Sequence, residues 1–159
     1  MTATGSDGRQ AIRTFAEHEH EELVTGIDRI HELSEQLVTL PVDQRATGVR
    51  KVLHWFDEDF RPHMAWEDSW LFPELDARAH TPWATRVVRF DHQQIATQAA
   101  RLHAHCAYGS HLSVHDAVTL VADLSGLEAL LRANLEREER FLLPLLEPEA
   151  ERWTPEWHD

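Results

Sequence analysis

Residues 63–75 read HMAWEDSWLFPEL, and residues 134–146, which lie 71 positions later (134 − 63), read NLEREERFLLPLL. Both stretches contain a glutamate followed by a second acidic residue, and then a leucine and a proline at the same offsets. A second matching pair, EHEEL at 19–23 and DHQQI at 91–95, lies earlier in each half. The chain is therefore an internal repeat of two units, each long enough for a helical hairpin, and two hairpins can pack around a pseudo-two-fold axis.

Apolar residues recur every three or four positions along four long segments, a period typical of amphipathic helices. We expect these helices over residues 11–40, 43–78, 81–108 and 113–146. Pro62 falls inside the second helix, where its missing N–H group predicts a kink. Short connections between four long helices favour an all-α fold, namely an antiparallel up-down-up-down four-helix bundle.

The length of 159 residues suits one domain, which we place at residues 11–147. Residues 1–10 are expected to form a disordered leader, and residues 148–159 an acidic tail that contains Trp153 and Trp157. A net charge of −13 argues against nucleic acid and membrane surfaces as partners, because both attract basic proteins. We recognise neither a signal peptide nor an apolar run of about 18 residues, the length of a membrane span. The single cysteine, Cys106, excludes an intrachain disulfide, so we expect a cytoplasmic protein.

Every predicted helix carries at least one polar residue within its apolar stripe. A helix turns by about 100° per residue, so residues three, four or seven apart share a face. His20 precedes Leu23 by three positions, and His92 precedes Ile95 by three. His103 shares the phase of His92 but lies about 16 Å further along the axis, too far for the same centre. The polar residues on the core faces are His20, His63 with Glu67, His92, and Asn134 with Glu138.

The two core-facing carboxylates point to a metal site. Burying a carboxylate without a partner is very costly, so Glu67 and Glu138 among imidazoles predict cations between them. A lone core histidine usually has a hydrogen-bond partner and no metal, but matching phases on four helices are hard to explain separately. Imidazole and carboxylate ligands suit iron or a related transition metal, whereas structural zinc sites usually contain thiolates. The predicted ligands are His20, His63, Glu67, His92 and Glu138.

This pattern resembles the hemerythrin/HHE cation-binding family over residues 11–147. The bacterial form of that family has a histidine on helix one, His-x-x-x-Glu on helix two, a histidine on helix three and His-x-x-x-Glu on helix four. The resemblance implies two iron ions between the helices, bridged by Glu67 and Glu138 and by an oxygen atom. It also implies that His20 and His63 hold one iron, while His92 and the residue at position 134 hold the other.

Asn134 departs from the family, which has histidine at the equivalent position. Three interpretations remain open. Asn134 is a weak ligand that leaves the second iron more open, it holds a water or a substrate beside the metal ligands, or the second metal binds poorly and the site is mono-iron. We favour an occupied but more open second site, because both bridging carboxylates remain.

Three functional hypotheses follow. The first is binding or sensing of O₂, NO or peroxide. The second is an enzyme, because an open coordination position is what distinguishes catalytic metal sites; it would oxidise an unknown small molecule with O₂ or peroxide, or break peroxide down. The third is a mono-iron or iron-handling protein. The sequence identifies no catalytic acid or base outside the metal ligands.

Overall fold

The computed structural model describes residues 4–107 and 111–147, so the predicted tail at 148–159 lies outside the described residues. Within these ranges all regular secondary structure is helical, which confirms the all-α prediction. The elements are α1 (Thr4–Gln36), α2 (Val42–Trp55), η1 (Phe56–Phe60), α3 (Arg61–Trp66), η2 (Glu67–Leu71), α4 (Phe72–Arg78), α5 (Arg86–Ala107), α6 (Val114–Arg137), η3 (Glu138–Leu142) and η4 (Leu143–Leu146). Of the short elements, η1, η2 and η3 are π-helical turns and η4 is a 3₁₀ turn.

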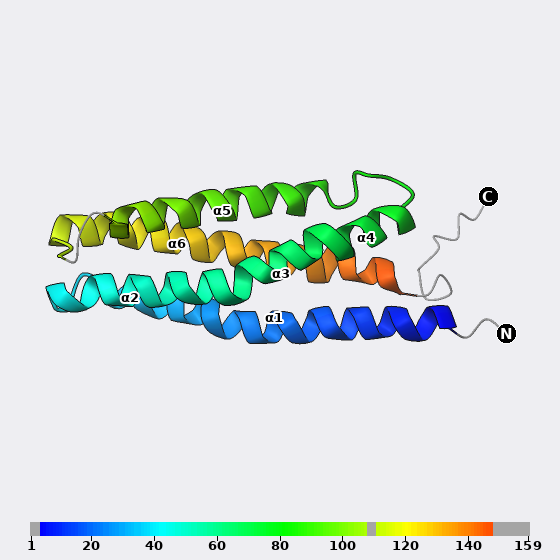
Figure 1. Ribbon diagram of the computed structural model, residues 1–159, viewed down its shortest axis with the longest axis horizontal. Helices are drawn as coiled ribbons and strands as arrows, with labels where there is room; N and C mark the ends of the chain where they lie inside the picture. Colours follow the sequence, from blue (N-terminus) through cyan, green and yellow to red (C-terminus); the bar gives the residue numbers. More distant parts are fainter. Residues whose placement is uncertain (1–3, 108–110, 148–159) are drawn as a thin grey trace, which may run out of the picture.

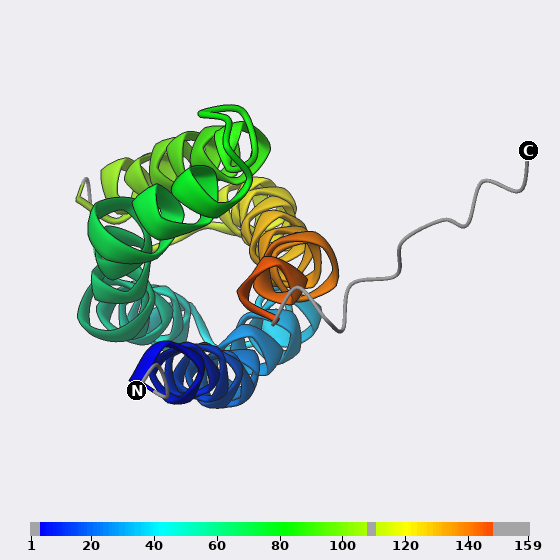
Figure 2. The same cartoon turned by 90° about the vertical axis from the view of Figure 1, so that its right-hand side faces the viewer.

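These elements form four long segments that run alternately in opposite directions (Figure 1). The second segment extends from α2 to α4 and the fourth from α6 to η4. Seen along the bundle axis in Figure 2, the segments occupy the corners of a square, with α1 and α5 on opposite corners. Helix α6 packs against both α1 and α5, and α2 likewise contacts both. The predicted antiparallel four-helix bundle is therefore confirmed.

The first helix differs from the prediction at both ends. It begins at Thr4, so residues 4–10, which we expected in a disordered leader, are helical. An established helix gains one hydrogen bond for each residue added, and this outweighs the poor helix propensity of Gly5 and Gly8. The helix ends at Gln36, before the predicted end at residue 40. There the buried Arg45 guanidinium donates to three backbone carbonyls, those of Val38, Leu40 and Leu112, which removes the need for further helical hydrogen bonds.

The third helix begins at Arg86, five residues later than the predicted residue 81. The chain leaves α4 through His80, whose φ of 51° is left-handed. The Asp76 carboxylate then accepts hydrogen bonds from the backbone N–H and the hydroxyl of Thr85 at 3.0 and 2.9–3.0 Å. This side-chain anchor holds residues 81–85 as a loop, a contact that helical periodicity does not reveal.

The three π turns each end two residues before a proline, namely Pro62, Pro73 and Pro144. Proline cannot donate to the carbonyl four residues earlier, and a π turn shifts the preceding hydrogen bonds to a carbonyl five residues earlier. Accordingly, the N–H of Arg61 bonds to the carbonyl of Phe56. Figure 1 shows the axis of the second segment changing direction between α2 and α3, which agrees with the predicted kink.

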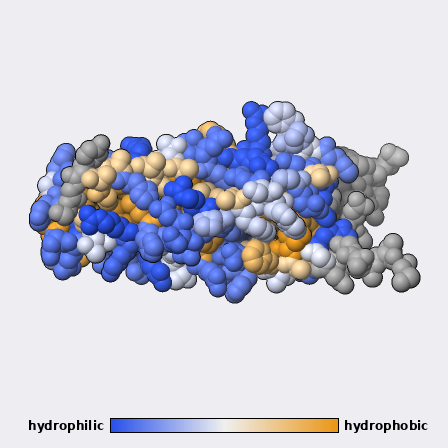
Figure 3. Space-filling view, in the orientation of Figure 1, coloured by the Kyte–Doolittle hydropathy of each residue, from blue (hydrophilic) through white to orange (hydrophobic). Residues whose placement is uncertain are grey.

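Apolar side chains fill the bundle in two separate clusters. The larger one includes Ile27, Phe56, Ile95 and Leu127. The smaller one consists of Ala16, Leu71, Phe72, Leu75, Val88, Leu142, Leu143 and Leu146. On the face shown in Figure 3, hydrophilic residues cover most of the surface, as expected when the apolar stripes face inward. None of the helices in the described ranges has the apolar length that crossing a lipid bilayer requires.

Candidate metal centre

A polar layer separates the two apolar clusters of the bundle. On α1, His20 lies between Ala16 of the smaller cluster and Leu23 of the larger one. On α5, His92 lies in the same way between Val88 and Ile95. The layer consists of His20, His63, Glu67, His92, Asn134 and Glu138, none of which is more than 5% exposed. The six residues predicted from the sequence therefore lie at one level of the bundle interior.

The two glutamates of this layer occupy equivalent backbone positions. Glu67 is the first residue of π turn η2, and Glu138 is the first residue of π turn η3. Their carbonyls accept the hydrogen bonds of Phe72 and Leu143, five residues later. The repeat seen in the sequence is thus a repeat of backbone geometry, and it presents one carboxylate from each half. Single π turns inside α-helices are frequent at functional sites.

Four of these side chains form the tightest group. One ligand atom from each of His20, His63, Glu67 and Glu138 lies within 4.8 Å of the others. Nε2 of His63 is 3.1 Å from Oε1 of Glu67, and Nε2 of His20 is 3.3 Å from Oε2 of Glu138. Separations of this size fit donor atoms that surround a single cation.

His92 approaches the same two carboxylates from the opposite side. Its Nε2 is 3.3 Å from Oε2 of Glu67 and 3.7 Å from Oε1 of Glu138. The oxygens that face His92 are thus different from those nearest to His63 and His20. Each carboxylate therefore presents one oxygen to each side of the layer, as a carboxylate that bridges two cations does.

Asn134 completes the layer without an imidazole. Its amide nitrogen donates a hydrogen bond to Oε1 of Glu138 at 2.6 Å, while its Oδ1 has no hydrogen-bond partner. The side of the layer that contains His92 therefore has one imidazole and one amide, whereas the other side has two imidazoles.

Burial and the close carboxylates oppose each other in setting the charges of this layer. Burial lowers the pKa of His20, but the nearby Glu138 and Glu67 carboxylates outweigh it and raise the pKa to about 10. At His92, burial also lowers the pKa, but the nearby Glu138, Glu67 and Asp68 carboxylates outweigh it and raise the pKa to about 10. Burial raises the pKa of Glu67, but the contacts with the three layer histidines lower it by more. The pKa of Glu67 therefore lies well below its usual value. Burial and the charge of Glu67 raise the pKa of Glu138.

Three further carboxylates face the outer nitrogens of the histidines. Nδ1 of His20 is 3.1 Å from Oε1 of Glu139, and Nδ1 of His92 is 3.0 Å from Oδ2 of Asp68. These two contacts are equivalent in the repeat, because each joins a histidine to the acidic residue that follows a layer glutamate. Glu19 lies 3.8 Å from Nδ1 of His63, beyond hydrogen-bond distance. A carboxylate on the outer nitrogen fixes the ring orientation and leaves the inner nitrogen free to bind a metal.

Asp68, Glu139 and Glu19 are not among the site residues predicted from the sequence. The E-[DE] pair repeated at 67–68 and 138–139 was the available signal for the first two. Glu19 lies in the repeated stretch 19–23, but that repeat did not indicate its approach to His63. His103 lies away from the polar layer, as predicted, with its ring 3.0 Å from Asp57. His31 is likewise outside the layer, 3.2 Å from Glu128.

The unpaired atoms of the layer test whether a metal fits. Among the described residues, nine buried side-chain nitrogen and oxygen atoms have no hydrogen-bond partner, and eight of them belong to this layer. Buried polar atoms are normally paired, and leaving one unpaired costs roughly 1–3 kcal/mol. The unpaired set consists of imidazole nitrogens, carboxylate oxygens and one amide oxygen, which are donors for a transition-metal cation. The donor set therefore fits a metal centre.

The family comparison agrees with this geometry. The chain matches the model of the hemerythrin HHE cation-binding domain over residues 12–146. Comparisons with curated proteins and with solved structures gave no match. The matched region spans nearly all of the described bundle and includes every residue of the polar layer. The chain therefore belongs to the hemerythrin HHE cation-binding domain family.

Proposed function

We propose that this protein is a non-haem di-iron protein that binds O₂, or the related ligands NO and peroxide, at the polar layer. The observation that carries the proposal is the set of eight buried, unpaired donor atoms contributed by all four helical segments. Imidazoles and carboxylates without thiolates suit iron better than a structural zinc ion.

The two sides of the layer suggest how two iron ions would be shared. His20 and His63 would hold one iron together with Glu67 and Glu138, and the separations of their ligand atoms support this. His92 would hold the other iron with the second oxygen of each carboxylate. The second iron would have its open side next to Asn134.

The surrounding residues favour a small uncharged ligand. When bound, iron supplies an open coordination position and access to two oxidation states. The protein supplies the rest: two apolar clusters exclude water from both ends of the layer, and Glu139 and Asp68 hold the His20 and His92 rings in place. A dry, apolar environment suits a diatomic molecule.

The test combines metal analysis with optical spectroscopy on one sample. We expect close to two iron ions per chain, and an absorption band that appears when the anaerobically reduced protein meets O₂ and fades on degassing. One iron per chain would support the mono-iron alternative. Full occupancy with no optical response to O₂, NO or peroxide would contradict the proposal.

Asn134 favours a second candidate function, an O₂- or peroxide-dependent enzyme that acts on a small molecule. An amide in place of an imidazole leaves a coordination position open, and catalytic metal sites differ from closed ones in this respect. This alternative predicts continuous consumption of O₂ with a reductant, or of peroxide alone, where a carrier would show a single stoichiometric uptake. An oxygen electrode distinguishes the two.

A further inference from the structure

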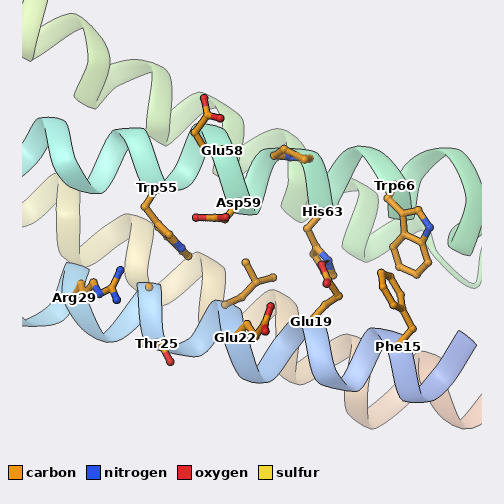
Figure 4. Close-up of a pocket in the computed structure, with 13 residues that line it drawn as sticks. Phe15, Glu19, Glu22, Thr25, Arg29, Trp55, Glu58, Asp59, His63 and Trp66 are labelled. Atoms are coloured by element: carbon orange, nitrogen blue, oxygen red, sulfur yellow. Dashed lines mark ion pairs between the residues drawn. The ribbon is translucent and has the colours of Figure 1, made fainter. Parts of the chain in front are cut away.

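A groove runs along the outside of the polar layer between α1 and the second helical segment (Figure 4). Its volume is about 550 Å³, and it reaches His63. The aromatic rings of Phe15 and Trp66, in edge-to-face contact at 5.2 Å, border it. This groove reaches the layer at His63, whereas a separate hollow, lined partly by the basic residues Arg61 and Arg89, reaches it at His92.

The groove is lined by an excess of negative charge. Glu19 and Glu22 line it from α1, and Glu58 and Asp59 from η1, against Arg29 as the basic residue. Within the described part of the chain, no ion pair neutralises Glu58 or Asp59, and Glu22 has only the exposed His18 nearby, at 3.6 Å. Carboxylates that line a concave surface concentrate cations in it and accelerate their association.

His63 connects this groove to the metal centre. Its side chain is 1% exposed and its Nε2 faces Glu67 at 3.1 Å inside the layer. Its Nδ1 has no hydrogen-bond partner and faces the Glu19 carboxylate at 3.8 Å. The outer nitrogens of His20 and His92, in contrast, are engaged by Glu139 and Asp68. Of the three layer histidines, His63 is thus the one whose ring is not held by a hydrogen bond from outside.

We infer that the groove is the entry route for divalent metal cations, with Glu22 and Asp59 attracting the ion and Glu19 passing it to His63. The ring of His63 forms the wall between groove and layer, with one nitrogen on each side. Because Nδ1 has no hydrogen-bond partner, the ring can turn and admit the ion without breaking a hydrogen bond on the groove side. The inference rests on the layer binding a metal, but it adds a kinetic role for residues outside the layer.

The rate of Co²⁺ uptake by the metal-free full-length protein tests this route. Cobalt(II) gives visible absorption bands when protein ligands surround it, so stopped-flow mixing reports uptake without any enzymatic assay. We expect Glu22→Gln/Asp59→Asn to slow uptake about tenfold at low ionic strength, since charged clefts raise association rates by about 10–1,000-fold. The difference should shrink in 0.5 M salt, while the final absorption bands and stoichiometry remain those of the wild type.

A matched control removes the same charge elsewhere on the same two helical segments. Glu32→Gln/Asp43→Asn changes two exposed carboxylates outside the groove, and its uptake rate should stay within about twofold of the wild type. For the transfer step, Glu19→Gln should slow uptake and Glu19→Asp should largely restore it.

The outcomes separate the route from the metal site. If the groove variant loads Co²⁺ as fast as the wild type, or if the control slows uptake equally, the groove is not the route. If Co²⁺ does not bind to the wild type at all, the proposed metal centre fails, and the route fails with it. If the wild type binds Co²⁺ and every variant takes it up at the same rate, the proposed metal centre stands and only the entry route is rejected.

Discussion

The side-chain amide of Asn134 donates a 2.6 Å hydrogen bond to Oε1 of Glu138, one helical turn further along the fourth segment. In the first half of the repeat, the equivalent pair is His63 and Glu67, where an imidazole nitrogen lies 3.1 Å from the carboxylate. The two halves therefore treat their carboxylates differently. The amide occupies an oxygen that a second cation would need, so the two metal positions should differ in affinity.

Asn134→His tests this asymmetry. An imidazole at position 134 would restore the second His-x-x-x-Glu motif, so the second metal equivalent should bind about tenfold more tightly, or about 1.4 kcal/mol. Bound O₂ should also become more stable and any turnover should fall. Titration of metal-free protein with Co²⁺ measures both equivalents, and Asn134→Leu, which offers no donor, is the control. Equal affinities in the wild type would refute the asymmetry.

The carboxylates behind the histidine rings should matter for metal affinity even though they lie outside the set of candidate ligands. Asp68→Asn and Glu139→Gln weaken the contacts that orient His92 and His20, and losses of this kind typically reduce metal affinity by about 10–100-fold. Competition with a chelator of known affinity measures the loss. Glu136→Gln, an exposed change on the same segment as Glu139, should leave affinity unchanged. The assignment fails if all three variants behave alike.

Metal uptake should release protons. In the metal-free fold the pKa values of His20 and His92 are raised from 6.5 to about 10, so both rings carry a proton near pH 7.5. The stability that these protons contribute is complete below pH 6.5 and is lost as the pH rises through about 10. Metal ligation requires neutral imidazoles, so metal affinity should rise over the same range. Calorimetry in buffers of different ionisation enthalpy should give about two protons released per chain at pH 7.5; release of none would contradict this charge assignment.

Gly26 provides a test of packing beside the groove. A Cβ at this position would lie 1.9 Å from Cε2 of Trp55, so the indole ring rests directly on the α1 backbone. Replacing a helical glycine by alanine usually stabilises by roughly 0.5–1 kcal/mol, but Gly26→Ala should instead destabilise by about 1–3 kcal/mol because Trp55 must move. Urea unfolding measures the free energy, and tryptophan fluorescence reports the displaced ring. Gly8→Ala, whose Cβ would meet nothing within 4 Å, should be neutral or stabilising.

The composition of the polar layer was predictable because helix geometry is local. With about 100° between successive residues, the sequence determines which side chains share a face. It therefore placed His20, Glu67, His92 and Glu138 on inward faces, and the short connections set them at one level. The repeat at 67–68 and 138–139 also implied equivalent backbone positions, which appear as the two π turns.

The pairing of individual atoms was decided by tertiary structure. His20 meets Glu139, 119 residues away, and His92 meets Asp68, 24 residues away. These contacts depend on the rotation and axial offset of neighbouring helices, which packing sets and periodicity does not encode. The same holds for the loop at 81–85, held by Asp76, and for the groove that reaches the buried His63. The sequence thus determined which donors the layer contains, because a helix repeats regularly, whereas only the packed bundle decided which donors are held from outside and which remain free.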